Sequence, residues 1–141
     1  MDIAITGPNG GKVDFGLAAF ATMAVKDFAK QLDISRLKTN IQVRIHNKLF
    51  IGDSGTEGLC EAVDNRHFII DVCLFGNWIS TLAHEMVHVK QFAKNELDPA
   101  LTRWKSNRYC ETIDYWDQPW EKEARRLQFK LVEDFEKRQL A

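Results

Sequence analysis

Two histidines and a glutamate stand close together in the segment His84-Glu85-Met86-Val87-His88. If this segment is helical, His84 and His88 share one face, because residues four apart in an α-helix lie one above the other. Two such imidazoles can bind one zinc ion at about 2.0–2.1 Å, with Glu85 beside the water that the metal holds. Zinc lowers the pKa of that water to about 7, and Glu85 can take its proton, which creates a nucleophile for a carbonyl carbon. The pattern therefore predicts peptide-bond hydrolysis.

The composition makes a chance match to this H-E-x-x-H pattern uncommon. With four histidines among 141 residues, a shuffled chain matches it somewhere in only about 0.7% of cases. The alternative is a pair of surface histidines on an amphipathic helix. The neighbouring residues would bury most of such a helix, because they are apolar: Leu82, Ala83, Met86, Val87 and Val89. We therefore favour a metal site.

A catalytic zinc usually takes a third protein ligand and leaves one position open for water. The remaining histidines, His46 and His67, both precede the motif, and the third-ligand position of the longer H-E-x-x-H-x-x-G-x-x-H pattern is Lys94. A downstream carboxylate is the natural substitute. The candidates are Glu96, Asp98, Glu111, Asp114, Asp117, Glu121 and Glu123, with Cys110 as an outside possibility.

Helical geometry ranks two of these carboxylates above the others. Pro119 suits a first helical position, and the apolar residues that follow form the stripe of a helix running to about Arg138. Glu121 lies about 60° from the centre of that stripe and Glu123 about 100° away. We expect Glu121 to be the third ligand, with Glu123 as its main competitor and a simple first-turn glutamate as the structural alternative.

The motif and the segment Pro119-Trp120-Glu121-Lys122-Glu123-Ala124 together resemble the minimal gluzincin-type zinc metallopeptidases, most closely their small phage and bacterial members. In that group the third ligand is a glutamate in an E-x-x-A segment on a later helix. The resemblance covers about residues 67 to 135. It implies that His84, His88 and Glu121 bind one zinc ion and that Glu85 is the general base.

The resemblance also implies a zincin-like α+β fold, with an N-terminal helix, a small twisted and mainly antiparallel sheet, the motif helix and a C-terminal glutamate helix. The larger gluzincins often carry an aspartate one position after the alanine of E-x-x-A. Here that position is Arg125, so a carboxylate that holds a ligating histidine must come from elsewhere or be missing.

Periodicity predicts the elements that must position these residues. It gives a helix from Leu17 to near Asp33, a strand over 41–45 with a possible partner at Leu49 to Ile51, and a loop over 52–58. Strands over 59–64 and 67–72 follow, then a helix from Trp78 to Asn95 and an irregular stretch over 100–118. The turn Asn65-Arg66 predicts an antiparallel hairpin that pairs Cys60 with Asp71 and Cys73 with Gly58, so no two cysteines face each other.

Weaker signals surround the predicted site. The strand His67 to Val72 could offer a sheet edge to an extended substrate, and it could equally be a central core strand. Four side chains could donate a hydrogen bond to the oxyanion that forms during attack: Tyr109, Tyr115, His67 and Arg108. For each of them alone, a packing or solvated role is the more common one.

Composition bounds the class of protein. A chain of 141 residues, 45% hydrophobic and 28% charged, fits one globular domain spanning residues 1–141. The net charge of −1 gives no bulk attraction to nucleic acid or anionic membrane. Three cysteines, the absence of an apolar run of roughly 20 residues and a start without a secretory signal favour a soluble cytoplasmic protein.

We expect a zinc-dependent metallopeptidase acting on a peptide or protein substrate, with neither nucleic acid nor membrane as a partner. One competing hypothesis is a zincin-like zinc-binding or regulatory module without turnover, although such a module does not need Glu85 as a base. Another is a hydrolase of a non-peptide amide, which would use the same residues. The oligomeric state is not predicted.

Overall fold

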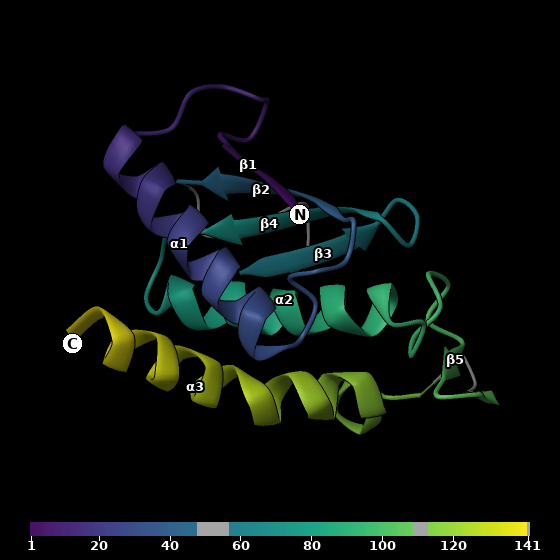
Figure 1. The fold of residues 1–141 in the computed structure, drawn as a ribbon. Coiled ribbons are helices and arrows are strands. Elements are labelled where there is room, and N and C mark those ends of the chain that lie inside the picture. The colour runs from purple at the N-terminus through teal and green to yellow at the C-terminus, as the bar shows by residue number, and fades with distance from the viewer. Residues whose placement is uncertain (48–56, 109–112, 141) are drawn as a thin grey trace.

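The computed structural model describes residues 1–47, 57–108 and 113–140. Its elements are β1 (Asp2–Thr6), α1 (Phe15–Gln31), β2 (Asn40–His46), β3 (Gly58–Ala62), β4 (His67–Cys73), α2 (Trp78–Ala93), β5 (Arg103–Trp104), β6 (Asn107–Arg108), the 3₁₀ turn η1 (Tyr115–Asp117) and α3 (Pro119–Leu140). The fold is α+β, as predicted, and its four-stranded sheet lies above α2 and α3, with α1 running obliquely past the sheet (Figure 1). Among the described residues, no helix is long and apolar enough to cross a membrane.

The sheet is mixed, so the prediction of a mainly antiparallel sheet is wrong. Its strand order is β1-β2-β4-β3, and the pairs β1–β2 and β2–β4 are parallel while β4–β3 is antiparallel. Strand β1 was not predicted, although Ile3 and Ile5 alternate with more polar neighbours. Helix α1 crosses over from β1 to β2, and such a crossover makes parallel neighbours. The possible strand at 49–51 and most of the predicted loop lie outside the described residues.

The β3–β4 hairpin is shifted by one residue from the predicted register. Cys60 pairs with Ile70 and Gly58 with Val72. The Asp64 carboxylate causes the shift, because it accepts backbone N–H groups of Arg66 at 2.8 Å and His67 at 2.9 Å and stabilises a turn one residue longer than predicted. Cys60 and Cys73 still do not face each other in this register.

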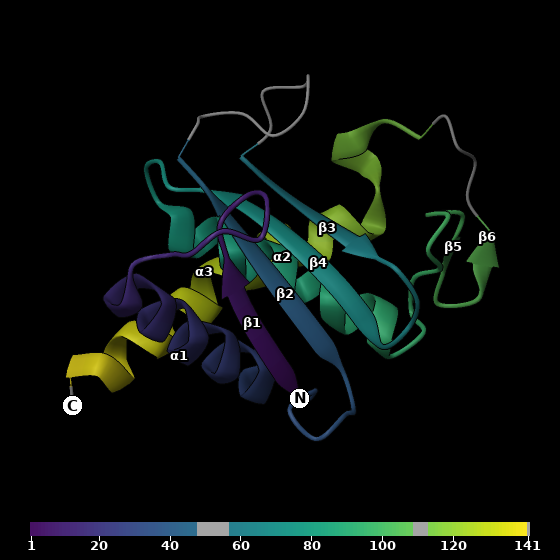
Figure 2. The same ribbon diagram turned by 90° about the horizontal axis from the view of Figure 1, so that it is seen from above.

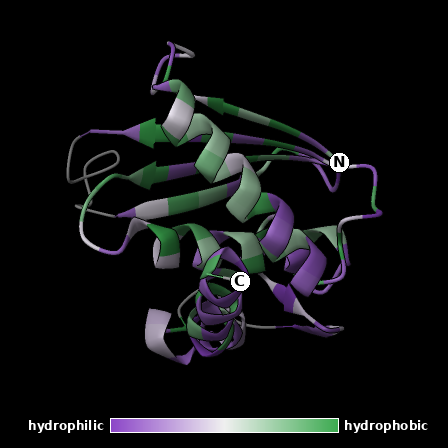
Figure 3. Ribbon diagram, turned by 60° about the vertical axis from the view of Figure 1, so that its left-hand side comes forward, coloured by the Kyte–Doolittle hydropathy of each residue, from purple (hydrophilic) through white to green (hydrophobic). Residues whose placement is uncertain are grey.

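One face of the sheet is buried against helices. The alternate residues of the two central strands point to that face: Ile41, Val43 and Ile45 on β2, and Phe68, Ile70 and Val72 on β4. Helix α1 contacts β1, and α2 contacts β3 and β4 (Figure 2). Helix α3 packs against α2 and α1, and its residues are mostly hydrophilic where the strands are mostly hydrophobic (Figure 3). Helix α2 therefore lies between the sheet and α3.

Local signals set the ends of the helices that flank the site. The Asn77 side chain caps α2 by accepting the Ser80 backbone N–H at 3.4 Å. The helix ends at Ala93, two residues before the predicted end, because Asn95 has the left-handed φ of 58° that commonly terminates helices. Pro119 begins α3, as predicted. Residues 100–118 contain only the small β5–β6 hairpin and η1 in their described part.

Gly58 lets the edge strand β3 approach α2 closely. A Cβ at this position would lie 2.5 Å from Thr81 Cγ2 and 3.4 Å from Glu85 Cγ. A contact of 2.5 Å between carbon atoms is far inside van der Waals distance. The glycine therefore keeps β3 directly beside the H-E-x-x-H segment.

We expect Gly58→Ala to lower the free energy of unfolding by about 1–3 kcal/mol, because the new methyl group collides with Thr81. Urea unfolding measures this change. Combining it with Thr81→Ser removes the opposing methyl group and should restore most of the loss. Gly11→Ala is the control, since a Cβ there meets nothing within 4 Å, and its effect should stay within about 0.5 kcal/mol. A double variant no more stable than Gly58→Ala would contradict the explanation.

Candidate metal centre

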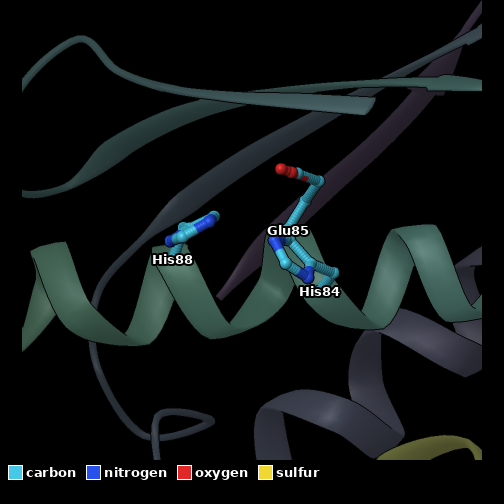
Figure 4. Close-up of side chains that lie close together, drawn as sticks. All are labelled: His84, Glu85 and His88. Atoms are coloured by element: carbon cyan, nitrogen blue, oxygen red, sulfur yellow. The ribbon is translucent and has the colours of Figure 1, made fainter. Parts of the chain in front are cut away.

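One turn of α2 brings His84, Glu85 and His88 together. A ligand atom of each lies within 4.8 Å of those of the other two, and the three side chains project from the same stretch of helix (Figure 4). The histidine rings are 5.1 Å apart at an interplanar angle of 76°. Glu85 and His88 are buried and His84 is partly buried. This burial does not fit a pair of solvent-facing histidines.

Helix α3 adds Glu121 to these residues. One carboxylate oxygen, Oε1, lies 2.9 Å from His84 Nε2, and the other, Oε2, lies 3.1 Å from His88 Nε2. Glu121 is itself buried, in the first turn of α3. Its carboxylate therefore meets the Nε2 atoms of both histidines at one point between the two helices.

Glu123, the competing third ligand, contacts other residues. It accepts hydrogen bonds from Lys90 Nζ at 2.9 Å and from Gln91 Nε2 at 3.1 Å. Glu96 pairs with Lys90, and Asp98 accepts the backbone N–H groups of Thr102 and Arg103. The remaining candidates are Asp114 and Asp117, which flank or belong to η1, and Cys110 and Glu111, which lie outside the described residues.

The charges of the site depend on one another. Burial opposes a charged His88, but the hydrogen bond with Glu121 and the nearby Glu85 outweigh it and raise the His88 pKa to about 9. Burial likewise opposes a charged Glu121, but its hydrogen bonds with His84 and His88 hold its pKa well below the ordinary value. Burial raises the pKa of Glu85, an effect that the two histidines only partly offset. The site thus buries two carboxylates, Glu85 and Glu121, beside a histidine that favours its protonated form.

A cleft of about 650 Å³ opens onto these residues. Its walls come from β3, α2, η1 and α3, and they include Gly58, Cys60, Thr81 and Trp116. Strand β3 has one strand neighbour among the described residues, whereas β4 is central. Of the two hypotheses for residues 67–72, the central core strand is therefore the correct one, and the sheet edge at the cleft belongs to β3.

Tyr115 is the one oxyanion candidate that the structure brings to this cleft, among those described. Its hydroxyl donates to Glu121 Oε1 at 2.9 Å. Burial and the charge of Glu121 raise the Tyr115 pKa to about 12, so the phenol keeps its proton at neutral pH. His67 pairs with Asp64 at the start of β4, and Arg108 is exposed on β6. Tyr109 lies outside the described residues.

Three residues around the site, Gln91, Gln128 and Arg125, make contacts that the sequence did not predict. Gln91 Oε1 lies 2.8 Å from His88 Nδ1, and Gln128 Oε1 lies 2.7 Å from His84 Nδ1. The ring nitrogens that face away from Glu121 thus meet side-chain amide oxygens. Arg125 stacks on Trp116 at 4.7 Å and donates to its carbonyl oxygen at 3.0 Å, so it holds η1 beside the cleft. The sequence offered one signal for the two glutamines, their helical spacing. Gln91 lies three residues after His88, and Gln128 lies seven residues after Glu121.

We expect the metal-free protein, prepared with a chelator, to lose stability between about pH 6.5 and 9. The folded-state pKa of His88 lies above its ordinary value of 6.5, so protonation stabilises the fold. That contribution is complete below pH 6.5 and is lost as the pH rises toward 9. Urea unfolding across this range measures the slope. His88→Gln lacks the titrating ring and should remove it, and equal slopes in both proteins would contradict the assignment.

Known proteins give no direct guide to this site. The chain matches no protein-family model, no curated protein and no solved structure. Its chemistry is therefore inferred from two histidines of one helix, a carboxylate of a second helix that contacts both, and a buried glutamate beside them.

Proposed function

We propose that this protein is a zinc-dependent metallopeptidase that hydrolyses peptide bonds in the cleft between β3, α2 and α3. One observation carries the proposal. The two carboxylate oxygens of Glu121 each contact the Nε2 atom of a different histidine, His84 or His88, although 33 residues separate His88 from Glu121.

The residues present fit zinc. Two imidazoles and one carboxylate are a donor set that zinc commonly takes in catalytic sites, and His84, His88 and Glu121 would hold it. Glu85 Oε2 is buried and has no hydrogen-bond partner among the described residues, which is costly unless something else in the site compensates it. Zinc, when bound, supplies a Lewis acid that polarises a carbonyl group and makes water more acidic.

In this proposal, Glu85 acts as the general base. It follows His84 directly and lies on the side of α2 that faces β3, where Gly58 leaves room for it. Its raised pKa lets Glu85 hold a proton more readily near neutral pH. A general base needs this property when it must later act as an acid. Glu85 takes the proton of the attacking water and passes it to the leaving amine.

Tyr115 supplies a hydrogen-bond donor on the part of the cleft that η1 lines. Its phenol retains its proton at neutral pH and lies beside Glu121. A donor that is already positioned stabilises negative charge as it develops on the carbonyl oxygen. We assign this role to Tyr115.

The edge strand β3 favours a peptide over a small amide as substrate. An extended peptide can add to a free sheet edge through main-chain hydrogen bonds. Strand β3 lines the cleft through Gly58, Leu59 and Cys60, and its only strand partner among the described residues is β4. A peptide lying along this edge would pass in front of Glu85.

We expect the purified protein to carry close to one zinc ion per chain and Glu121→Ala to lose it, because that change removes a ligand. Glu123→Ala should remain largely loaded, because Glu123 contacts Lys90 and Gln91 in place of the histidine Nε2 atoms. Elemental analysis after incubation with zinc and gel filtration measures both. Absence of zinc from the wild type, or loss only in Glu123→Ala, would overturn the assignment.

We expect Glu85→Gln to keep zinc and to lower the rate of peptide hydrolysis by at least about 10²-fold, because the amide cannot accept the proton of water. Mass spectrometry of a mixed peptide library measures cleavage. Glu133→Gln is the matched control, since the same change on the exposed part of α3 should leave the rate unaltered. Equal cleavage by Glu85→Gln and the wild type would refute this role, and a wild type that binds zinc without cleaving any peptide would favour the non-catalytic module.

A further inference from the structure

We propose that Gln91 is a positioning residue that fixes the tautomer of His88, and that Glu123 holds Gln91 in the required orientation. The inference rests on the proposed metal site. Gln91 is fully buried on α2, three residues after His88, and its Oε1 lies 2.8 Å from His88 Nδ1. Residues three apart on a helix are neighbours, so this contact forms within one turn.

The surroundings of Gln91 dictate which end of its amide faces His88. Its Nε2 donates to the Trp120 carbonyl oxygen at 2.9 Å and to Glu123 Oε1 at 3.1 Å. A carbonyl and a carboxylate can only accept hydrogen bonds. The reverse orientation would place the amide oxygen of Gln91 against both acceptors. The amide oxygen must therefore point to His88.

An acceptor at that position decides the protonation of the His88 ring. His88 Nδ1 has to donate to Gln91, so a neutral ring carries its proton on Nδ1 and its lone pair on Nε2. Nε2 is the atom that lies 3.1 Å from Glu121 Oε2, at the centre of the candidate site. Gln91 thus presents His88 to a metal in the only neutral form that can bind it there.

Glu123 is fixed in turn by Lys90. The Lys90 ammonium donates to Glu123 at 2.9 Å and also lies 2.8 Å from Glu96. Glu123 accepts from both Lys90 and Gln91, so its carboxylate is the acceptor that orients the Gln91 amide. A chain of contacts thus runs from Lys90 through Glu123 and Gln91 to His88. In this chain Glu123, the competing candidate for the third ligand, orients Gln91.

The tautomer can be tested without any substitution. In the zinc-loaded protein, two-bond ¹H–¹⁵N correlation spectra should show His88 protonated at Nδ1 and unprotonated at Nε2. A His88 ring protonated at Nε2 would overturn the proposal. A wild-type chain that takes up no zinc would overturn the proposed metal site, and the proposed role of Gln91 with it.

The role of Gln91 is tested by Gln91→Met, which keeps the size of the side chain and removes both ends of the amide. The zinc dissociation constant, measured by competition with a chromogenic chelator, should rise about 10- to 100-fold. Gln139→Met is the matched control, because it makes the same change at an exposed position near the end of α3. It should stay close to the wild type. Unchanged zinc affinity in Gln91→Met would overturn the proposal.

A double variant separates this role from simple packing. In Gln91→Glu with Glu123→Gln, the new carboxylate can accept from His88 and the new amide can donate to that carboxylate. The carboxylate cannot donate to the Trp120 carbonyl, so of the two hydrogen bonds to α3 only the one to position 123 is restored. We expect the double variant to bind zinc at least about tenfold more tightly than Gln91→Met. Affinity no better than that of Gln91→Met would show that an acceptor facing His88 is not what Gln91 supplies, and would overturn the proposal.

Discussion

The contact between the first turn of α3 and the middle of α2 is the constraint on which the site depends. Every interaction that links Glu121 or Glu123 to the H-E-x-x-H helix crosses this boundary. Trp120 and Ala124 are almost completely buried there, and the Trp120 carbonyl accepts from Gln91. Apolar packing fixes the distance between the helices, and the polar groups can then pair. A shift of α3 by even one residue would separate Glu121 from both histidines.

Charge burial connects the stability of this boundary with its chemistry. Two carboxylates, Glu85 and Glu121, are buried beside two imidazoles, and buried charges are costly unless they are compensated. Without metal, a proton on His88 supplies that compensation, as its raised pKa indicates. A zinc ion would replace this proton and would likewise compensate the negative charge of the carboxylates. Metal binding would then contribute to the free energy of folding. The groups to which we assign the chemistry are therefore also those whose burial is costly without a compensating cation.

The mixed sheet has a direct consequence for the cleft. Because β4 inserts between β2 and β3, β3 is the outermost strand of the sheet among the described residues, and Gly58 allows it to lie against α2. Hydrophobic alternation located β2, β3 and β4 to within a few residues, but it does not encode which strands become neighbours. It also left the hairpin register one residue out, since the Asp64 side chain lengthens the turn. Strand order depends on long-range pairing, and short-range patterns carry little information about it.

The sequence by itself determined what is local. The periodicity of apolar residues located the three helices, and a spacing of four residues placed His84 and His88 on one face, because backbone geometry within a helix is fixed. It also ranked Glu121 above Glu123 from the apolar stripe of a single helix. The tertiary structure alone decided that Glu121 reaches both histidines and that Gln91 and Gln128 meet their other nitrogens. Those contacts depend on how two helices more than 25 residues apart in the chain pack against each other, and no local pattern specifies that packing.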